Sequence, residues 1–138
     1  MEIDQITGTI IDSAMRVHTA LGPGMLESVY EKCLRHELKK RGLSVESQVW
    51  LPVIYDGEEI EGGYKIDLLV EHEVVVELKV VEQVLEVHKA QLLSYLKLAD
   101  KRVGLLINFN VVHLRDGIRR LVNNYGSSAS PASPAVLV

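Results

Sequence analysis

The sequence is poor in cysteine and in positive charge, and it lacks long apolar runs. Its single cysteine, Cys33, excludes an internal disulfide framework and any zinc site made only of cysteine. A formal net charge of −4 argues against a domain that coats nucleic acid by bulk attraction, but it leaves room for an enzyme that reaches a few phosphates through a bound cation. No apolar run approaches the roughly 20 residues of a membrane helix, and the start does not resemble a signal peptide. We therefore expect a cytoplasmic protein that makes no membrane contact.

Enough apolar material is present for one packed core. The chain has 138 residues, of which 47% are hydrophobic, and this size and composition favour one domain, over residues 1–125. Small residues and proline dominate the remainder, so we predict a disordered tail over residues 126–138.

The spacing of the apolar residues changes along the chain. Spacings of three and four predict helices over residues 3–20, 25–41 and 84–99, and a short closing helix over roughly 117–124. Alternation and valine-rich runs predict strands over residues 45–51, 64–70, 74–80 and 104–109. This order predicts an α/β fold of the α+β, mixed-sheet kind, in which helices flank a central mixed β-sheet.

Three charged residues stand out on two neighbouring predicted strands. Side chains two apart on a strand share a face, so Glu77 and Lys79 point the same way. If residues 71–73 form a three-residue hairpin loop, Asp67 lies directly opposite Glu77, with Cβ atoms about 5 Å apart. Two carboxylates at that distance repel each other unless a cation lies between them, and Mg²⁺ or Mn²⁺ suits oxygen ligands.

This geometry depends on the assumed register. A two-residue loop would place Glu77 on the other face of the sheet. Charged residues on strands are also often simply solvated, and from spacing alone a solvent-exposed pair of carboxylates remains an alternative. The strongly apolar surroundings of Glu77 favour a central strand instead, where buried charges need partners.

Two further groups of polar residues lie on predicted helices. Gln91 and Tyr95 share a stripe on the helix after the Glu77 strand, and the alternative for them is an ordinary helix face. Glu27 and Tyr30 follow the kink at Gly22-Pro23-Gly24. A carboxylate in the first turn favours the helix dipole by about 0.3–1 kcal/mol, which alone could explain Glu27.

Taken in order, these residues resemble a known superfamily. Asp67, then Glu77-Leu78-Lys79, then Gln91 and Tyr95 resemble the PD-(D/E)XK nucleases. The stretch from Gly24 through Glu27 to Tyr30 is similar to the signature of the small GxxExxY family within that superfamily. The likeness extends from about Ile6 to Val122. Ile66 stands before Asp67, where relatives can have proline.

The resemblance implies a restriction-endonuclease-like core and a role for each matched residue. Asp67, Glu77 and the backbone carbonyl of Leu78 would hold Mg²⁺ or Mn²⁺, and Lys79 would orient the attacking water and steady the developing charge. Glu27 would complete the acidic site as a catalytic group or as a further metal ligand. Gln91, Tyr95 and Tyr30 would support Lys79 or the substrate.

The sequence thus predicts a metal-dependent nuclease that hydrolyses phosphodiester bonds of DNA or RNA. The alternative is a catalytically silent module of the same fold that binds nucleic acid or a protein partner, and a homodimer is compatible with either. A third alternative is a structural subunit whose polar cluster only specifies the fold. Trp50 also has two interpretations: a stacking platform for a nucleic-acid base or, more commonly, packing in the sheet.

Overall fold

The elements follow the predicted order up to the last one. This computed structural model describes residues 1–124, and the tail predicted over residues 126–138 lies outside them. The helices are α1 (Ile3–Leu21), α2 (Glu27–Lys40) and α3 (Glu86–Ala99). The strands are β1 (Val45–Tyr55), β2 (Glu58–Val70), β3 (Val74–Lys79), β4 (Val103–Asn108) and β5 (Ile118–Val122). None of the helices within the described residues has the length and apolar character that crossing a membrane requires.

The strands form one mixed sheet in the order β1-β2-β3-β4-β5. Only the β3–β4 pair is parallel, because α3 connects these two strands, and the other neighbours are antiparallel. β3 is the middle strand, and its residues from Val74 to Leu78 are buried. The predicted central mixed sheet is therefore confirmed.

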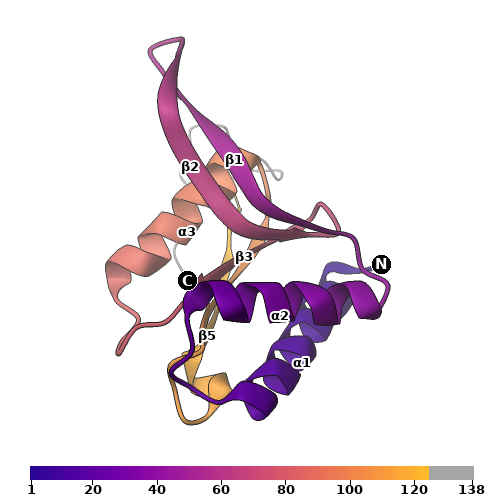
Figure 1. Cartoon of the computed structure of the whole chain (residues 1–138). Helices are drawn as coiled ribbons and strands as arrows, with labels where there is room; N and C mark the ends of the chain where they lie inside the picture. Colours follow the sequence, from indigo (N-terminus) through magenta and orange to yellow (C-terminus); the bar gives the residue numbers. More distant parts are fainter. Residues whose placement is uncertain (125–138) are drawn as a thin grey trace.

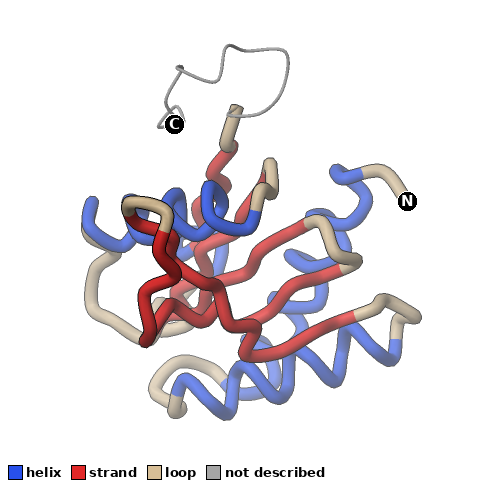
Figure 2. Tube along the Cα trace, turned by 90° about the horizontal axis from the view of Figure 1, so that it is seen from above, coloured by secondary structure: helices blue, strands red, loops and turns tan. Residues whose placement is uncertain are grey.

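Helices cover both faces of the sheet (Figures 1 and 2). The α1 and α2 side is filled by a core that includes Ile6, Ile10 and Leu34, together with alternate β3 residues such as Val76 and Leu78. Val75, between Val74 and Val76, belongs to the second core, under α3. The alternation predicted for β3 is thus observed, with Leu78 in the layer opposite to that of its neighbours.

The closing helix predicted over residues 117–124 is wrong. A short 3₁₀ helix, η1 (Leu114–Gly117), is followed by β5, which pairs antiparallel with β4. Ile118 and Leu121 stand at a spacing of three, which suited a helix, but β4 is buried along its whole length and one of its edges would be unpaired without β5. Pairing with β5 gives the backbone N–H and C=O groups of that edge their hydrogen bonds. This tertiary interaction decides the conformation of residues 118–122, although their apolar spacing suits a helix.

β1 and β2 form a long hairpin that extends beyond the rest of the sheet (Figure 1). The strands are joined by a turn at Asp56-Gly57, with φ angles of 53° and 77°. The strands continue further than the sequence indicated, to Tyr55 on one side and from Glu58 on the other. Near the root of the hairpin, Gln48 has a φ angle of 54°, a conformation that is uncommon for residues other than glycine.

Candidate active site

Asp67 and Glu77 meet where β2 and β3 separate. The hairpin between the strands has the three-residue loop assumed above, since Val70 pairs with Val74, and Leu68 with Val76 is the last pair of the ladder. One register step further, the carboxylates of Asp67 and Glu77 take the place of backbone carbonyls in the hydrogen bonds between the two strands. The Asp67 N–H donates to Glu77 Oε1 at 2.9 Å, and the Leu78 N–H donates to Asp67 Oδ2 at 2.8 Å. The two carboxylates therefore cross-link the diverging strands and lie together.

Lys79 follows at the end of β3, in a position fixed by β4. It pairs with Asn108, which is 2% exposed. The Asn108 side chain accepts a bond from the Val81 N–H at 3.1 Å and donates to the Val81 carbonyl at 2.8 Å. Asn108 thus holds the chain just beyond Lys79. No sequence motif pointed to this residue, because the contact joins segments that are 27 residues apart.

Glu27 reaches the same place from α2. It begins the helix directly after the Gly22-Pro23-Gly24 kink, as an exposed residue of the first turn. Tyr30 is fully buried and stacks on Phe109, with ring centroids 4.4 Å apart. Its hydroxyl donates to the Gly22 carbonyl and accepts a bond from the Met25 N–H. The structure therefore places Tyr30 as an anchor of the kink, and Glu27 is close enough to Asp67 and Lys79 for their charges to affect its pKa.

Two residues that the sequence did not indicate join the site from α2 and β1. Glu31 lies one turn after Glu27, and its Oε1 accepts a 2.6 Å bond from Gln48 Nε2. The Gln48 side chain also lowers the pKa of Asp67, so its amide lies near this carboxyl group as well. The left-handed backbone of Gln48 thus coincides with a side chain that binds Glu31 and lies near Asp67. An amide at this point separates two acids that would otherwise repel each other.

Of the two α3 residues predicted for the site, the structure links Tyr95 to the acids. Tyr95 is 6% exposed, and its ring lies 5.5 Å from that of Tyr64 on β2. Burial, followed by the charges of Glu77 and Asp67, raises the pKa of Tyr95 to about 12, so its hydroxyl stays protonated beside the acids. Gln91 is half-buried one turn earlier, and within residues 1–124 no hydrogen bond joins it to the acids or to Lys79.

The comparison with protein families agrees with this arrangement. The model of the PD-(D/E)XK nuclease superfamily matches residues 4–121. The chain belongs to this superfamily. Searches of curated proteins and of solved structures gave no match to the chain. The match is at the level of the superfamily, and the GxxExxY assignment stays a prediction.

The candidate site gathers carboxyl groups around Glu77, which is buried. Burial, and then the charge of Asp67, raises the pKa of Glu77 to about 8. Burial also raises the pKa of Asp67, against the opposing effects of the Leu78 N–H and Lys79. Partial desolvation and Asp67 raise the pKa of Glu27 and of Glu31. A bound cation would stabilise the ionised form of these acids, because its positive charge would offset both the burial of the carboxylates and their mutual repulsion.

The donor set suits a hard divalent cation. Within residues 1–124, no three His, Cys, Asp or Glu side chains are grouped so as to hold a metal ion as they stand. Mg²⁺ needs fewer protein ligands, since it keeps several waters and is commonly held by one or two carboxylates together with substrate phosphate. Asp67 and Glu77 each use one oxygen on a backbone N–H, which leaves a second oxygen on each carboxylate. Nucleases of this superfamily generally use divalent metals, and the residues present fit such an ion.

Proposed function

We propose that this protein is a nuclease that hydrolyses phosphodiester bonds with the help of Mg²⁺ or Mn²⁺. The observation that carries the proposal is the pair of carboxylates at the point where β2 and β3 separate, with Lys79 two residues after Glu77. Membership of the PD-(D/E)XK superfamily supports the same reaction class.

Each residue has a distinct task in this proposal. Asp67 and Glu77, with the Leu78 carbonyl, would hold the metal ion, which would polarise the scissile phosphate and lower the pKa of a bound water. Lys79 is close enough to lower the pKa of both carboxyl groups, so its ammonium can orient the attacking water and stabilise charge on the phosphate.

The remaining residues act through these groups. Tyr95 keeps its proton and can donate a hydrogen bond toward the acids or the phosphate. Glu27 would add a negative group at the open side of the site, as a further metal ligand or as an acceptor for a metal-bound water. Gln91, half-buried on the same helix as Tyr95, remains a candidate contact for the substrate.

The test is cleavage of labelled single- and double-stranded DNA and RNA with Mg²⁺ or Mn²⁺. We expect Lys79→Met to reduce the rate on the order of 100-fold or more, as the loss of one stabilising group at a reacting centre does elsewhere. Lys40→Met is the matched control: it removes the same charge at the far end of α2, where the largely exposed Lys40 ammonium lies 3.7 Å from Glu37, which keeps Arg16 and Arg41 as partners. Such pairs contribute about 0–1 kcal/mol, so this variant should retain both fold and rate.

Two results would count against catalysis. Cleavage that is equal in wild-type, Lys79→Met and Glu77→Gln protein would come from a contaminant. Absence of both cleavage and Mg²⁺ or Mn²⁺ binding, with nucleic acid or a protein partner still bound, would favour the catalytically silent alternative.

A further inference from the structure

The only tryptophan of the chain is largely exposed to solvent at the root of the β1–β2 hairpin. Trp50 on β1 is 63% exposed and pairs with Lys65 on β2. The Lys65 ammonium lies 4.8 Å from the centroid of the indole ring. A large aromatic side chain gains little from such exposure, so packing in the sheet does not explain why Trp50 stands here. The lysine fixes the ring through a cation–π contact and leaves much of its surface open.

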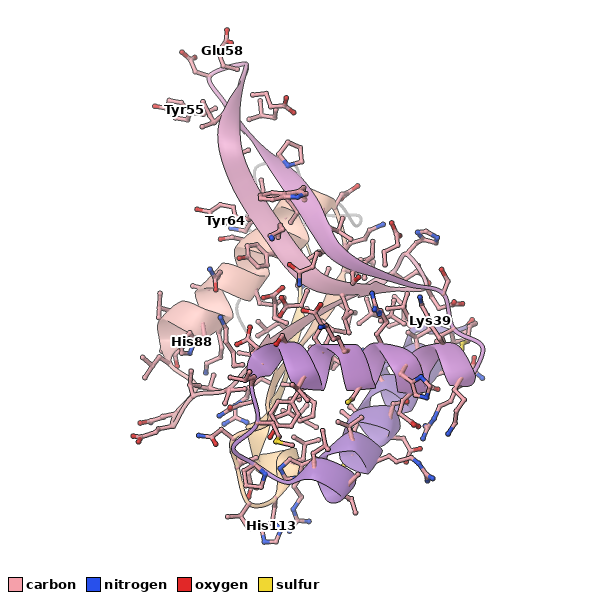
Figure 3. All side chains as sticks on the ribbon, in the orientation of Figure 1. Lys39, Tyr55, Glu58, Tyr64, His88 and His113 are labelled. Carbon is pink, nitrogen blue, oxygen red and sulfur yellow. The ribbon has the colours of Figure 1, made fainter. Side chains whose placement is uncertain are left out.

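This pair lies beside the carboxylates. Lys65 is two residues before Asp67, and Ile66 between them is buried in the core under α3. Tyr64, on the other side of Lys65, also faces α3 (Figure 3). Trp50 and Lys65 therefore lie on the hairpin face away from α3. Lys65 lowers the pKa of both Asp67 and Glu31, which places its ammonium within electrostatic reach of the site.

The charge along the hairpin limits where a polyanion can lie. The tip carries Asp56, Glu58 and Glu59, all exposed, and these acids repel phosphate. Lys65 is the cationic residue of the hairpin that contacts an exposed aromatic ring. A nucleic-acid strand that enters the site is therefore favoured at the root of the hairpin and disfavoured at its tip.

We propose that Trp50 and Lys65 form a subsite for one unstacked nucleotide of a single strand, adjacent to the phosphate that would be cleaved. This inference rests on the proposed nuclease function and narrows its substrate to single-stranded DNA or RNA, including unpaired ends. The indole stacks on the base, and the ammonium contacts the neighbouring phosphate. A paired base inside a duplex has both faces covered by its neighbours, so it cannot use this ring.

Binding is measured on the full chain in a Lys79→Met background, which keeps the carboxylates and slows cleavage. With Mg²⁺ present, we titrate oligothymidylate, oligouridylate and a blunt DNA duplex while following the emission of the sole tryptophan. Both single strands should quench it, and the duplex should not. Fluorescence anisotropy of labelled oligonucleotides then compares Trp50→Leu with Tyr55→Leu, which removes an exposed aromatic ring from the tip of the same hairpin.

We expect Trp50→Leu to weaken single-strand binding roughly 5- to 150-fold, the range for the loss of one base–aromatic stack, and Tyr55→Leu to have no effect. Binding without quenching, or equal affinity of wild-type and Trp50→Leu protein, would overturn the inference even if cleavage is normal. Emission that depends on protein concentration, with a dimer lost in Trp50→Leu, would assign this face to a second copy of the chain and also overturn it. Quenching by single strands in a protein that never cleaves would instead support the subsite and refute the nuclease.

Discussion

Replacing Glu77 with glutamine should stabilise the metal-free protein at neutral pH while abolishing its proposed activity. Glu77 is 6% exposed, and its Oε1 accepts the N–H of Asp67. Glutamine has nearly the same shape and keeps an oxygen for this bond, so the substitution removes the charge and leaves the strand contact. The unfavourable part of Glu77 is its ionisation beside Asp67 in a buried position.

The size and sign of the effect follow from the two pKa values of Glu77. Its ordinary value is 4.5, and burial and Asp67 raise it to about 8 in the folded state. Between these values the folded protein holds a proton that the unfolded chain has released, so the free energy of unfolding falls as the pH rises. At about 1.36 kcal/mol per pH unit, the wild-type protein should lose on the order of 3 kcal/mol between about pH 4.5 and pH 7 through this group.

Urea unfolding at several pH values measures this difference, with EDTA present. We expect Glu77→Gln to exceed the wild type by about 3 kcal/mol at pH 7 and to approach it near pH 4.5. Mg²⁺ should restore stability to the wild type and not to the variant, because it binds the ionised acid. Glu73→Gln, at an exposed acid of the adjacent turn, is the control and should change stability by about 0.5 kcal/mol or less. A variant that is less stable than the wild type at pH 7 and above would refute the reasoning.

Three further substitutions test how the site is held. Tyr30→Phe removes two hydrogen bonds from the kink, including that to Gly22, and should lower the free energy of unfolding in urea by about 1–2 kcal/mol. An unchanged urea midpoint would show that the Tyr30 hydroxyl does not stabilise the kink. Gln48→Ala should leave the fold intact and raise the Mg²⁺ concentration needed for half-maximal cleavage, because two acids lose the amide between them; an unchanged requirement would contradict this role. Gly117→Ala would bring a methyl group to 2.2 Å from the Asn108 carbonyl oxygen and should destabilise the protein by about 1–3 kcal/mol in thermal unfolding, whereas full stability would show that this backbone can move.

The register of the central hairpin could be predicted because it depends on neighbouring residues. Valine-rich runs on both sides of a short polar segment define the two strands, and the length of the loop then fixes which residues oppose each other. The observed loop places Glu71 and His72 at φ angles of 54° and 57°. That left-handed pair allows Val70 to pair with Val74 without a glycine.

Contacts between distant segments could not be predicted in this way. Gln48 is an unremarkable polar residue in an alternating strand, and its role comes from a left-handed backbone that turns its amide toward Glu31 and Asp67. β5 was mistaken for a helix because the unpaired edge of β4 is not visible in the local sequence. The exposure of Trp50 likewise depends on how far the hairpin extends beyond the sheet.

The carboxylates of the site lower the stability of the folded protein, and the buried apolar residues of β3 offset this loss. Each of the four valine and leucine side chains at positions 74, 75, 76 and 78 is fully buried. Full burial of such a side chain contributes about 1.5–3 kcal/mol, so together these residues exceed the loss of stability at pH 7 that is estimated above for Glu77. The two contributions also act at different places. The apolar side chains fill the cores on both faces of the sheet, whereas Glu77 and Lys79 lie beyond the last β2–β3 pair, where the two strands separate. A strand with this composition can therefore hold repelling acids at its end without a metal ion, and the ion becomes a requirement of the proposed reaction while the fold does not depend on it.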